Sequence, residues 1–471
     1  MTNSNTPDTE IEITDFATDG DGLGIAQNGQ GQSIAVQIPF ACPGDRVLVQ
    51  LRKRKINKYR SNEITWLSLS KARSTPRCVH FGKCGGCRWQ HIPYQEQLQQ
   101  KERLVKALLQ AHFNKETVFH PIIACDPPWH YRNKLEFSFS SDKAGKRYLG
   151  LILFNTRGHV FQLTECHLGH PWMVEALNAT TKWWVDMDLE AYHPMHDTGA
   201  LRTLTVRCGE RTGDRMVILT VSGNADYALT KQQLQTFVAM MRQNLEEGGL
   251  YQLSIVLRIQ QVAKKQPTQF YEMILYGKDH ILEELNIDQQ KIYLQVSPTA
   301  FLQPNTRQAE KLYSHILQAL SCDDIENKVL FDLYCGTGTL GLCLAHRVKK
   351  VIGIELVPES VLDAKENIKH NQRENIVIYQ GDVGAVLNTL QESPPDIVLV
   401  DPPRAGLDLK AISNILALKA KTLVYVSCNP NTQAANLIPI IENGYKLKTV
   451  QPVDQFPHTL HVENIVVLTK V

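Results

Sequence analysis

The sequence predicts a multidomain α/β protein with a small N-terminal β-barrel, an α+β central domain and a C-terminal doubly wound domain. Three observations lead to this prediction. First, short segments in which apolar and polar residues alternate are separated by Gly, Asp and Asn near the N-terminus. Next, helix and strand patterns are mixed in the region that follows a cysteine cluster. Towards the C-terminus strands alternate with helices. We place the domains at residues 1–70, 71–290 and 291–471.

The N-terminal barrel is predicted from alternating segments at residues 11–13, 34–38 and 47–49, with a turn at 19–22. A basic run at 52–60 holds six Lys and Arg residues. Such a run is often a solvated sheet edge. Because little net charge lies elsewhere in the chain, its concentration on one small β domain also fits contact with nucleic-acid phosphates.

Composition narrows the class of protein. The formal net charge is only +2, which by itself neither favours nor excludes nucleic acid. The polar N-terminus does not resemble a signal peptide, and no apolar run approaches the roughly 18 residues of a membrane span. We therefore expect a cytoplasmic protein without membrane contact. Eleven cysteines in such a chain argue against a disulfide framework.

Three of the cysteines, Cys78, Cys84 and Cys87, fall within ten residues of a glycine-rich loop. Clustering of this kind indicates a metal or cluster site that needs a fourth ligand. The spacing is too irregular for a paired zinc knuckle, whereas an all-thiolate iron–sulfur cluster fits. The candidates for the fourth ligand are Cys125, Cys166, His80 and His91.

The central domain is predicted from periodicity. Apolar residues at helical spacing indicate helices over 94–112, 171–185 and 229–246. Alternating patterns at 134–139 and 215–221 indicate antiparallel strands.

The C-terminal domain shows five strand–helix units, which require a mainly parallel sheet covered on both faces. Two more strands without a full helix between them indicate a closing antiparallel hairpin. The predicted strands are 329–333, 351–355, 376–379, 397–400, 423–426, 445–450 and 463–469.

A cofactor crevice is predicted where these strands end. A Gly-x-Gly turn at 332–339 follows the first strand, and Glu355, Asp382 and Asp401 follow the next three. Each acid alone is explained as a helix cap, but the set lines the edge where doubly wound sheets bind ligands. Gly341 supplies the third glycine of the Gly-x-Gly-x-x-Gly fingerprint of dinucleotide-binding dehydrogenases. The Asp-Pro-Pro-Arg turn that begins at Asp401 is not typical of dehydrogenases and argues against that class.

Cys428 follows the fifth strand and precedes a proline turn that opens a helix. A lone cysteine is usually a small buried apolar residue. Here the helix start is expected to lower its pKa, which favours a nucleophile. A base is then needed for proton removal, and Glu463, His458 and His461 are all candidates from the sequence.

Four motifs in this order resemble the RNA uracil-5-methyltransferase family of class I S-adenosylmethionine enzymes. They are Asp-Leu-Tyr-Cys-Gly-x-Gly, Asp-Pro-Pro-Arg-Ala-Gly, Ser-Cys-Asn-Pro and Phe-Pro-His-Thr-x-His-x-Glu. The resemblance implies a class I methyltransferase domain, with Cys428 as nucleophile and Glu463 as base. It also implies cofactor contacts from Gln303, Tyr334, Glu355, Asp382 and Asp401.

The ribosomal-RNA branch of that family is also similar in its Cys-x₅-Cys-Gly-Gly-Cys motif. This similarity implies a 4Fe–4S cluster held by Cys78, Cys84, Cys87 and Cys166, and an RNA-binding TRAM domain at the N-terminus. The implied reaction is methylation of carbon 5 of a uridine in 23S rRNA, through a covalent cysteine adduct at carbon 6. We expect the enzyme to act as a monomer.

Three alternatives remain at this point. The RNA substrate can be tRNA, although bacterial tRNA members of the family typically lack the barrel and the cysteine cluster. A non-catalytic ribosome-assembly factor would not need the intact Cys428, Glu463 and Asp401 set. An iron–sulfur electron carrier would leave the doubly wound domain without a purpose.

Overall fold

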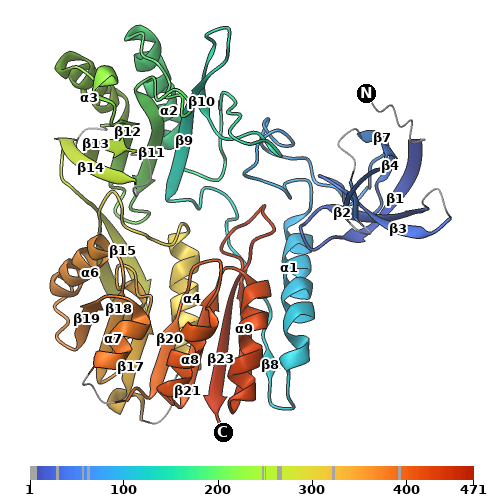
Figure 1. Ribbon diagram of the computed structural model, residues 1–471, viewed down its shortest axis with the longest axis vertical. Helices are drawn as coiled ribbons and strands as arrows, with labels where there is room; N and C mark the ends of the chain where they lie inside the picture. Colours follow the sequence, from blue (N-terminus) through green and yellow to red (C-terminus); the bar gives the residue numbers. More distant parts are fainter. Residues whose placement is uncertain are drawn as a thin grey trace.

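The computed structural model describes residues 8–27, 31–55, 58–60, 64–246, 249, 251–262, 268–320, 324–390 and 394–471. Within them the chain builds three large sheets (Figure 1). The N-terminal sheet (blue) lies to one side, the central sheet (green) lies at the top of the view, and the C-terminal sheet (yellow to red) lies below it.

The N-terminal sheet has seven strands in the order β5-β6-β3-β2-β1-β4-β7. Alternate side chains of β1, β3 and β4 are buried in a small core of their own, so the predicted strand pattern is confirmed. Closure of these strands into a barrel stays a prediction. The basic run forms the backbone of β5 and β6, but its side chains lie outside the described residues. The bounds are β1 Asp8–Phe16, β2 Gly22–Gln27, β3 Ser33–Ile38, β4 Arg46–Gln50, β5 Arg52–Lys55, β6 Lys58–Arg60 and β7 Ile64–Ser68.

Two ion pairs fasten this sheet to the segment that follows it. The buried carboxylate of Asp45 accepts hydrogen bonds from Arg73 Nε at 2.8 Å and Arg73 Nη2 at 2.7 Å. Arg88, just after the cysteine loop, pairs with the buried Asp21 of the β1–β2 turn. Paired Arg–carboxylate contacts of this kind fix orientation as well as distance. The N-terminal sheet is therefore anchored to the cysteine loop.

The central sheet has the order β10-β9-β11-β12-β13-β14. Most pairs are antiparallel, but β12 and β13 run parallel, which the sequence prediction did not include. The reason is the crossover helix α3 between them, since parallel neighbours cannot be joined by a tight turn. Helices α2 and α3 pack into the same core as the sheet. The bounds are β9 Lys134–Ser141, β10 Arg147–Gly150, α2 Pro171–Asp186, β11 Leu201–Cys208, β12 Arg215–Ser222, α3 Lys231–Leu245, β13 Leu253–Gln261 and β14 Gln269–Tyr276.

The C-terminal sheet has eight strands in the order β19-β18-β17-β20-β21-β23-β22-β8. Strands β17 to β21 are parallel, and β23 is antiparallel to both β21 and β22, so the predicted doubly wound sheet and closing hairpin are confirmed. The strands are β17 Val329–Leu333, β18 Lys350–Glu355, β19 Ile376–Gln380, β20 Ile397–Val400, β21 Thr422–Ser427, β22 Tyr445–Val453 and β23 Glu463–Lys470. The helices are α4 Thr306–Ala319, α5 Thr339–Leu344, α6 Pro358–His370, α7 Val383–Thr389, α8 Leu409–Ala417 and α9 Pro430–Glu442.

The order of these strands determines where a ligand binds. The chain moves outward from β17 through β18 to β19 and then returns to the other side of β17 at β20. At such a reversal the helices on either side diverge and leave a crevice at the carboxyl ends of the strands. A separate hairpin of β15 Ile281–Ile287 and β16 Gln290–Val296 packs beside α4 and α6.

Part of the C-terminal layer comes from far earlier in the chain. Helix α1 (Tyr94–Leu109) packs against α9, and the short strand β8 (Val118–Phe119) pairs with β22 at the sheet edge. Val105 and Leu109 of α1 are buried in the core of the C-terminal sheet. The residues after the cysteine loop are thus built into the layer that carries the predicted catalytic residues. Over the described residues, we find no helix long and apolar enough to cross a membrane.

A buried ion pair secures α1 in this position. Lys101 Nζ lies 2.5 Å from Asp454 Oδ1, and both side chains are fully buried. The same carboxylate accepts a hydrogen bond from Tyr94 Oη at 2.7 Å. Removing one partner of a buried pair leaves the other charge without compensation, which is costly.

Lys101→Met should therefore destabilise the protein by about 3–5 kcal/mol, because Asp454 remains buried without its cation. We expect a lower melting temperature and a lower urea midpoint. The double variant Lys101→Met/Asp454→Asn should recover part of the loss. Lys106→Met, on the exposed face of the same helix, is the control and should change little. Equal losses for Lys101→Met and Lys106→Met would contradict the role of the pair.

Candidate active site

A tight turn follows β17 at the crevice. Tyr334, Gly336 and Gly338 have φ angles of 65°, 54° and 71°, in the left-handed region. Glycine adopts this conformation without steric cost, whereas Tyr334 is held in it under strain. The Gly336 N–H donates to Glu355 Oε2 at 3.0 Å. The glycine turn and the end of β18 are therefore fixed against each other.

The Glu355 carboxylate is oriented by two backbone groups. One oxygen accepts from Gly336 and the other accepts from the Val357 N–H at 2.8 Å. Each carboxylate oxygen keeps a further acceptor position. The group is thus held at the rim of the crevice with capacity to bind two hydroxyls.

The other predicted cofactor residues lie at the same edge. Asp382 follows β19, where its side chain also caps α7 by accepting from the Ala385 N–H at 3.0 Å. Burial raises the pKa of Tyr334, and the charges of Asp408 and Asp382 raise it further, which places Tyr334 near both acids. Asp401 directly follows β20.

Gln303 approaches from outside the sheet. It is buried, and its Oε1 accepts from Gln455 Nε2 at 3.4 Å. Two residues earlier, the Phe301 carbonyl accepts from Thr337 Oγ1 of the glycine turn at 3.3 Å. The segment before α4 is thereby joined both to the turn and to the loop that precedes β23.

Cys428 and Glu463 meet through the strand register. Ser427 at the end of β21 pairs with Asn464 of β23, so the next opposing positions are Cys428 and Glu463. Glu463 is only 2% exposed, in a strand flanked by β21 and β22. Burial raises the pKa of this carboxyl well above its usual range, the charge of Asp401 raises it further, and Arg404 partly opposes both.

The Cys428 thiol is half-buried. Burial raises its pKa, Glu463 and Asp401 raise it further, and Arg404 lowers it. The expectation that the helix start lowers the pKa of Cys428 is therefore wrong for the resting protein. Burial and two carboxyl groups outweigh a single guanidinium, so the resting thiol carries its proton.

Of the two histidine candidates for the base, His458 is packed into the structure. Its ring stacks on Trp129 with the centroids 3.8 Å apart, and its Nδ1 lies 3.2 Å from Gln97 Nε2. Its carbonyl accepts from the N–H groups of Arg88 and Trp89 at 2.9 and 3.1 Å. Burial lowers the pKa of His458 to about 4. These contacts give it a structural role.

His461 lies closer to the crevice, where Arg404 Nη2 approaches its Nδ1 at 2.9 Å. Burial, with Arg404 next, lowers the pKa of His461 to about 4, so the ring is neutral and weakly basic at pH 7. The pKa of Glu463 is raised, so its carboxylate is a stronger base than either histidine once it is ionised. The charge of Glu463 also raises the pKa of the Cys428 thiol, which shows that the two groups lie close together.

A second site lies at the cysteine loop, away from this crevice. Cys78, Cys84, Cys87 and Cys166 line one cavity of about 340 Å³. Burial raises the pKa of the Cys87 thiol to about 12, and the other three thiols contribute by their proximity. The structure thus brings together the four cysteines that the family resemblance implies.

The remaining candidates for the fourth ligand are placed differently. Cys125 lines another cavity, where its thiol accepts from Asn305 Nδ2 at 3.3 Å. His80 borders the cysteine cavity, but its Nε2 accepts from the Thr164 N–H at 3.0 Å. His91 is not among the residues that line this cavity. Cys166 lines the same cavity as Cys78, Cys84 and Cys87. Among the described residues, no hydrogen-bond partner is found for its side chain.

Comparison with known proteins gives the same family. Residues 241–471 match the family model described as tRNA (Uracil-5-)-methyltransferase. An RNA methyltransferase of Protochlamydia amoebophila is 55% identical over 444 residues, covering 92% of this chain and 100% of the relative. One from Caldanaerobacter subterraneus is 34% identical over 98% of both chains. This chain belongs to the RNA uracil-5-methyltransferase family.

The fold of this RNA methyltransferase also matches a solved structure. The Pyrococcus abyssi tRNA (uracil-54, C5)-methyltransferase, in complex with S-adenosyl-L-homocysteine, superposes with a TM-score of 0.72. The match covers 98% of this chain and 100% of that one at 23% identity. The protein is an S-adenosylmethionine-dependent RNA methyltransferase with a mixed α/β fold.

One buried acid of the methyltransferase was missed from the sequence. Asp332 is 2% exposed and accepts from the Gly341 N–H at 2.9 Å. A Cβ at Gly341 would come within 3.0 Å of Asp332 Oδ2, so glycine there lets α5 approach β17. Burial raises the pKa of Asp332 to about 7. The signal was an acid inside an otherwise apolar strand.

Asp332→Asn should raise the melting temperature at pH 8 by several degrees, and at pH 5 by roughly a third as much. The pKa of Asp332 is raised in the folded state, so folding retains a proton and stability falls as pH rises from about 4 through 7. Asparagine keeps the acceptor for Gly341 and never ionises.

Thermal melting at both pH values measures this difference. Asp188→Asn, where the side chain is 92% exposed, is the control and should show no pH-dependent gain. A gain for Asp332→Asn of the same size at pH 5 and pH 8 would mean that ionisation of Asp332 is not its cause.

Proposed function

We propose that this methyltransferase modifies carbon 5 of a uridine through a covalent bond between Cys428 Sγ and carbon 6 of the base. The observation that carries the proposal is the opposition of Cys428 and Glu463 across β21 and β23, with Asp401 and Arg404 close enough to change both pKa values. A nucleophile, a base and a cation at one end of the parallel sheet suit this reaction.

The chemistry explains why each group is needed. Carbon 5 of uracil is too weak a nucleophile to accept a methyl group unaided. When Cys428 Sγ bonds to carbon 6, the electron pair of the 5,6 double bond moves towards carbon 5 and O4 as an enolate. The thiol proton passes to the Asp401 carboxylate, which leaves Glu463 available as the base for carbon 5, while Arg404 favours the thiolate.

Bound S-adenosylmethionine supplies the methyl group that carbon 5 accepts. Glu463 then removes the proton from carbon 5, the 5,6 double bond re-forms and Cys428 leaves as thiolate. We assign the cofactor contacts to the residues around the glycine turn and the strand ends. They are Gln303, Tyr334, Glu355, Asp382 and Asp401.

Cys428→Ala should bind RNA and cofactor but form no covalent species, because the attacking sulfur is gone. Glu463→Gln keeps the shape of the side chain but cannot accept the carbon 5 proton. We expect it to accumulate a denaturant-resistant, methylated protein–RNA adduct that depends on the cofactor. A denaturing gel of RNA incubated with the variant and methyl-labelled S-adenosylmethionine detects it as a labelled, retarded band.

His458→Gln and His461→Gln are the matched controls for the base. Neither should trap the adduct as strongly as Glu463→Gln. Normal turnover of Glu463→Gln together with trapping by a histidine variant would transfer the role of base to that histidine. Adduct formation by Cys428→Ala would remove Cys428 as the nucleophile.

We further propose that the four cysteines hold a 4Fe–4S cluster. The support is a single cavity with a mainly apolar lining that all four thiol-bearing residues share. In the described part of the chain, these sulfurs do not form a group within 4.8 Å of one another. A single tetrahedral zinc ion brings its sulfur ligands to about 3.8 Å, so a larger cluster fits better. Because methyl transfer needs no external electrons, the cluster would position the loop.

Cys166→Ala should lose the iron of anaerobically purified protein, about four atoms per chain in the native form. Cys125→Ala should keep it, because Cys125 lines a different cavity. Iron analysis and the visible absorption spectrum measure both. Stoichiometric zinc without iron in the native protein would refute the iron–sulfur cluster. Loss of iron in Cys125→Ala but not in Cys166→Ala would make Cys125 the fourth ligand.

The substrate that we propose is 23S rRNA. We assign residues 1–70 to an RNA-binding TRAM domain, residues 71–290 to the central domain that carries the cluster, and residues 291–471 to the methyltransferase domain. The basic run at 52–60 would contact phosphates. We propose a cytoplasmic monomer. A second candidate is tRNA, which the description of the matching family model favours. Mass-spectrometric mapping of 5-methyluridine in both RNAs, with and without the gene, decides between them.

A further inference from the structure

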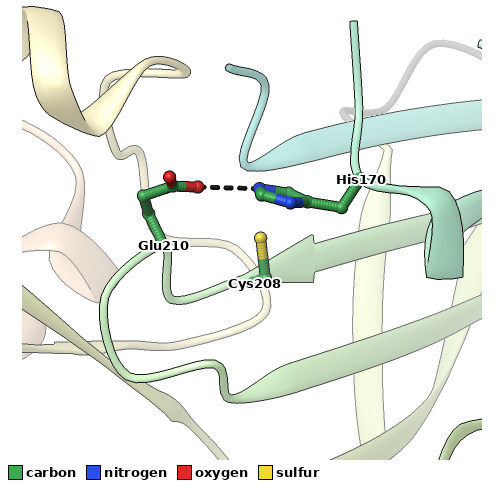
Figure 2. A group of neighbouring side chains, drawn as sticks. All are labelled: His170, Cys208 and Glu210. Atoms are coloured by element: carbon green, nitrogen blue, oxygen red, sulfur yellow. Dashed lines mark hydrogen bonds and ion pairs between the residues drawn. The ribbon is translucent and has the colours of Figure 1, made fainter. Parts of the chain in front are cut away.

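Three side chains with metal-binding atoms converge in the central domain, outside the crevice and the cysteine cavity (Figure 2). His170 precedes α2, Cys208 ends β11, and Glu210 lies in the loop that leads to β12. Their ligand atoms all lie within 4.8 Å of one another. In the part of the chain that the structure describes, no other set of three His, Cys, Asp or Glu residues meets this condition.

The thiol of this group comes from the core of the central domain and lies beside the other two side chains. Cys208 is 4% exposed, and Figure 2 shows its sulfur pointing towards the His170–Glu210 pair. Over the described residues no hydrogen bond is found for this sulfur. A buried thiol beside an imidazole and a carboxylate has the donor set that zinc prefers.

The two partners of Cys208 are already oriented. His170 Nε2 lies 2.7 Å from Glu210 Oε2, and Arg307 of α4 holds the other Glu210 oxygen at 3.0 Å. The Glu210 N–H donates to the buried Glu283 at 2.8 Å. Groups held in this way by outer partners are typical of metal sites, where such contacts fix the ligand orientation.

The site also has an open side. His170 and Glu210 line a cavity of about 270 Å³, with Arg307 and Trp129 among its other walls. A fourth ligand such as water has room to approach from this cavity. Three protein ligands with one open position form a common zinc geometry.

We propose that His170 Nε2, Cys208 Sγ and a Glu210 carboxylate oxygen bind one Zn²⁺, with water from the cavity as fourth ligand. Binding releases the thiol proton and the proton between His170 and Glu210, so affinity falls as pH falls. The ion fastens the start of α2 to the β11–β12 loop, next to the contact of that loop with α4. This site is independent of the reaction proposed for Cys428.

The test uses the full-length protein, purified anaerobically. Adventitious zinc is removed with a chelator, about one equivalent of Zn²⁺ is restored, and bound zinc is measured by plasma mass spectrometry after gel filtration. Co²⁺ in place of zinc gives a second readout, the thiolate-to-cobalt charge-transfer band. Neither readout depends on methylation, so failure here is distinct from failure of the proposed function.

Wild-type protein should retain about one zinc per chain, and Cys208→Ser and His170→Gln should bind zinc at least roughly tenfold more weakly. His170→Gln guards against misfolding, because this side chain is 27% exposed. Cys343→Ser, a buried cysteine of α5, should behave as wild type. Absence of zinc from the wild type, or retention in His170→Gln with loss in Cys84→Ser, would overturn the site.

Discussion

The buried ion pair between Lys101 and Asp454 holds the loop that precedes Glu463 in position. Tyr94, Gln97 and Lys101 recur at i, i+3 and i+7 along α1, so they share one face of the helix. Through them α1 contacts Asp454, the carbonyl of Phe456 at 3.0 Å and the N–H of His458 at 2.9 Å. The loop that leads into Glu463 is thus fixed by a helix more than 350 residues earlier in the chain.

The same loop organises the N-terminal half. The carbonyl of His458 accepts the N–H groups of Arg88 and Trp89, directly after the cysteine loop, and Arg88 pairs with Asp21 of the N-terminal sheet. A change at the cysteine cavity can therefore reach the β22–β23 loop through a short run of backbone hydrogen bonds. This connection gives the proposed cluster a positioning role that needs no electron transfer.

Acidic groups dominate the crevice. Asp332, Asp401 and Glu463 all have raised pKa values because burial penalises their charged forms, and Arg404 is the cation that acts on both Glu463 and Cys428. A protonated thiol at rest avoids a further buried negative charge. In the reaction that we propose, substrate binding would remove water and change the balance of charges around Cys428, and so would control its reactivity.

The sequence by itself predicted the strand–helix units of the C-terminal sheet, its closing antiparallel hairpin and the residues that follow its strands. Apolar periodicity, glycine turns and short motifs are local signals that survive without tertiary contacts. It did not determine the parallel β12–β13 pair, the incorporation of β8, the protonation of Cys428 or the meeting of His170, Cys208 and Glu210. These features depend on burial and on contacts between residues far apart in the chain, which only the packed structure decides.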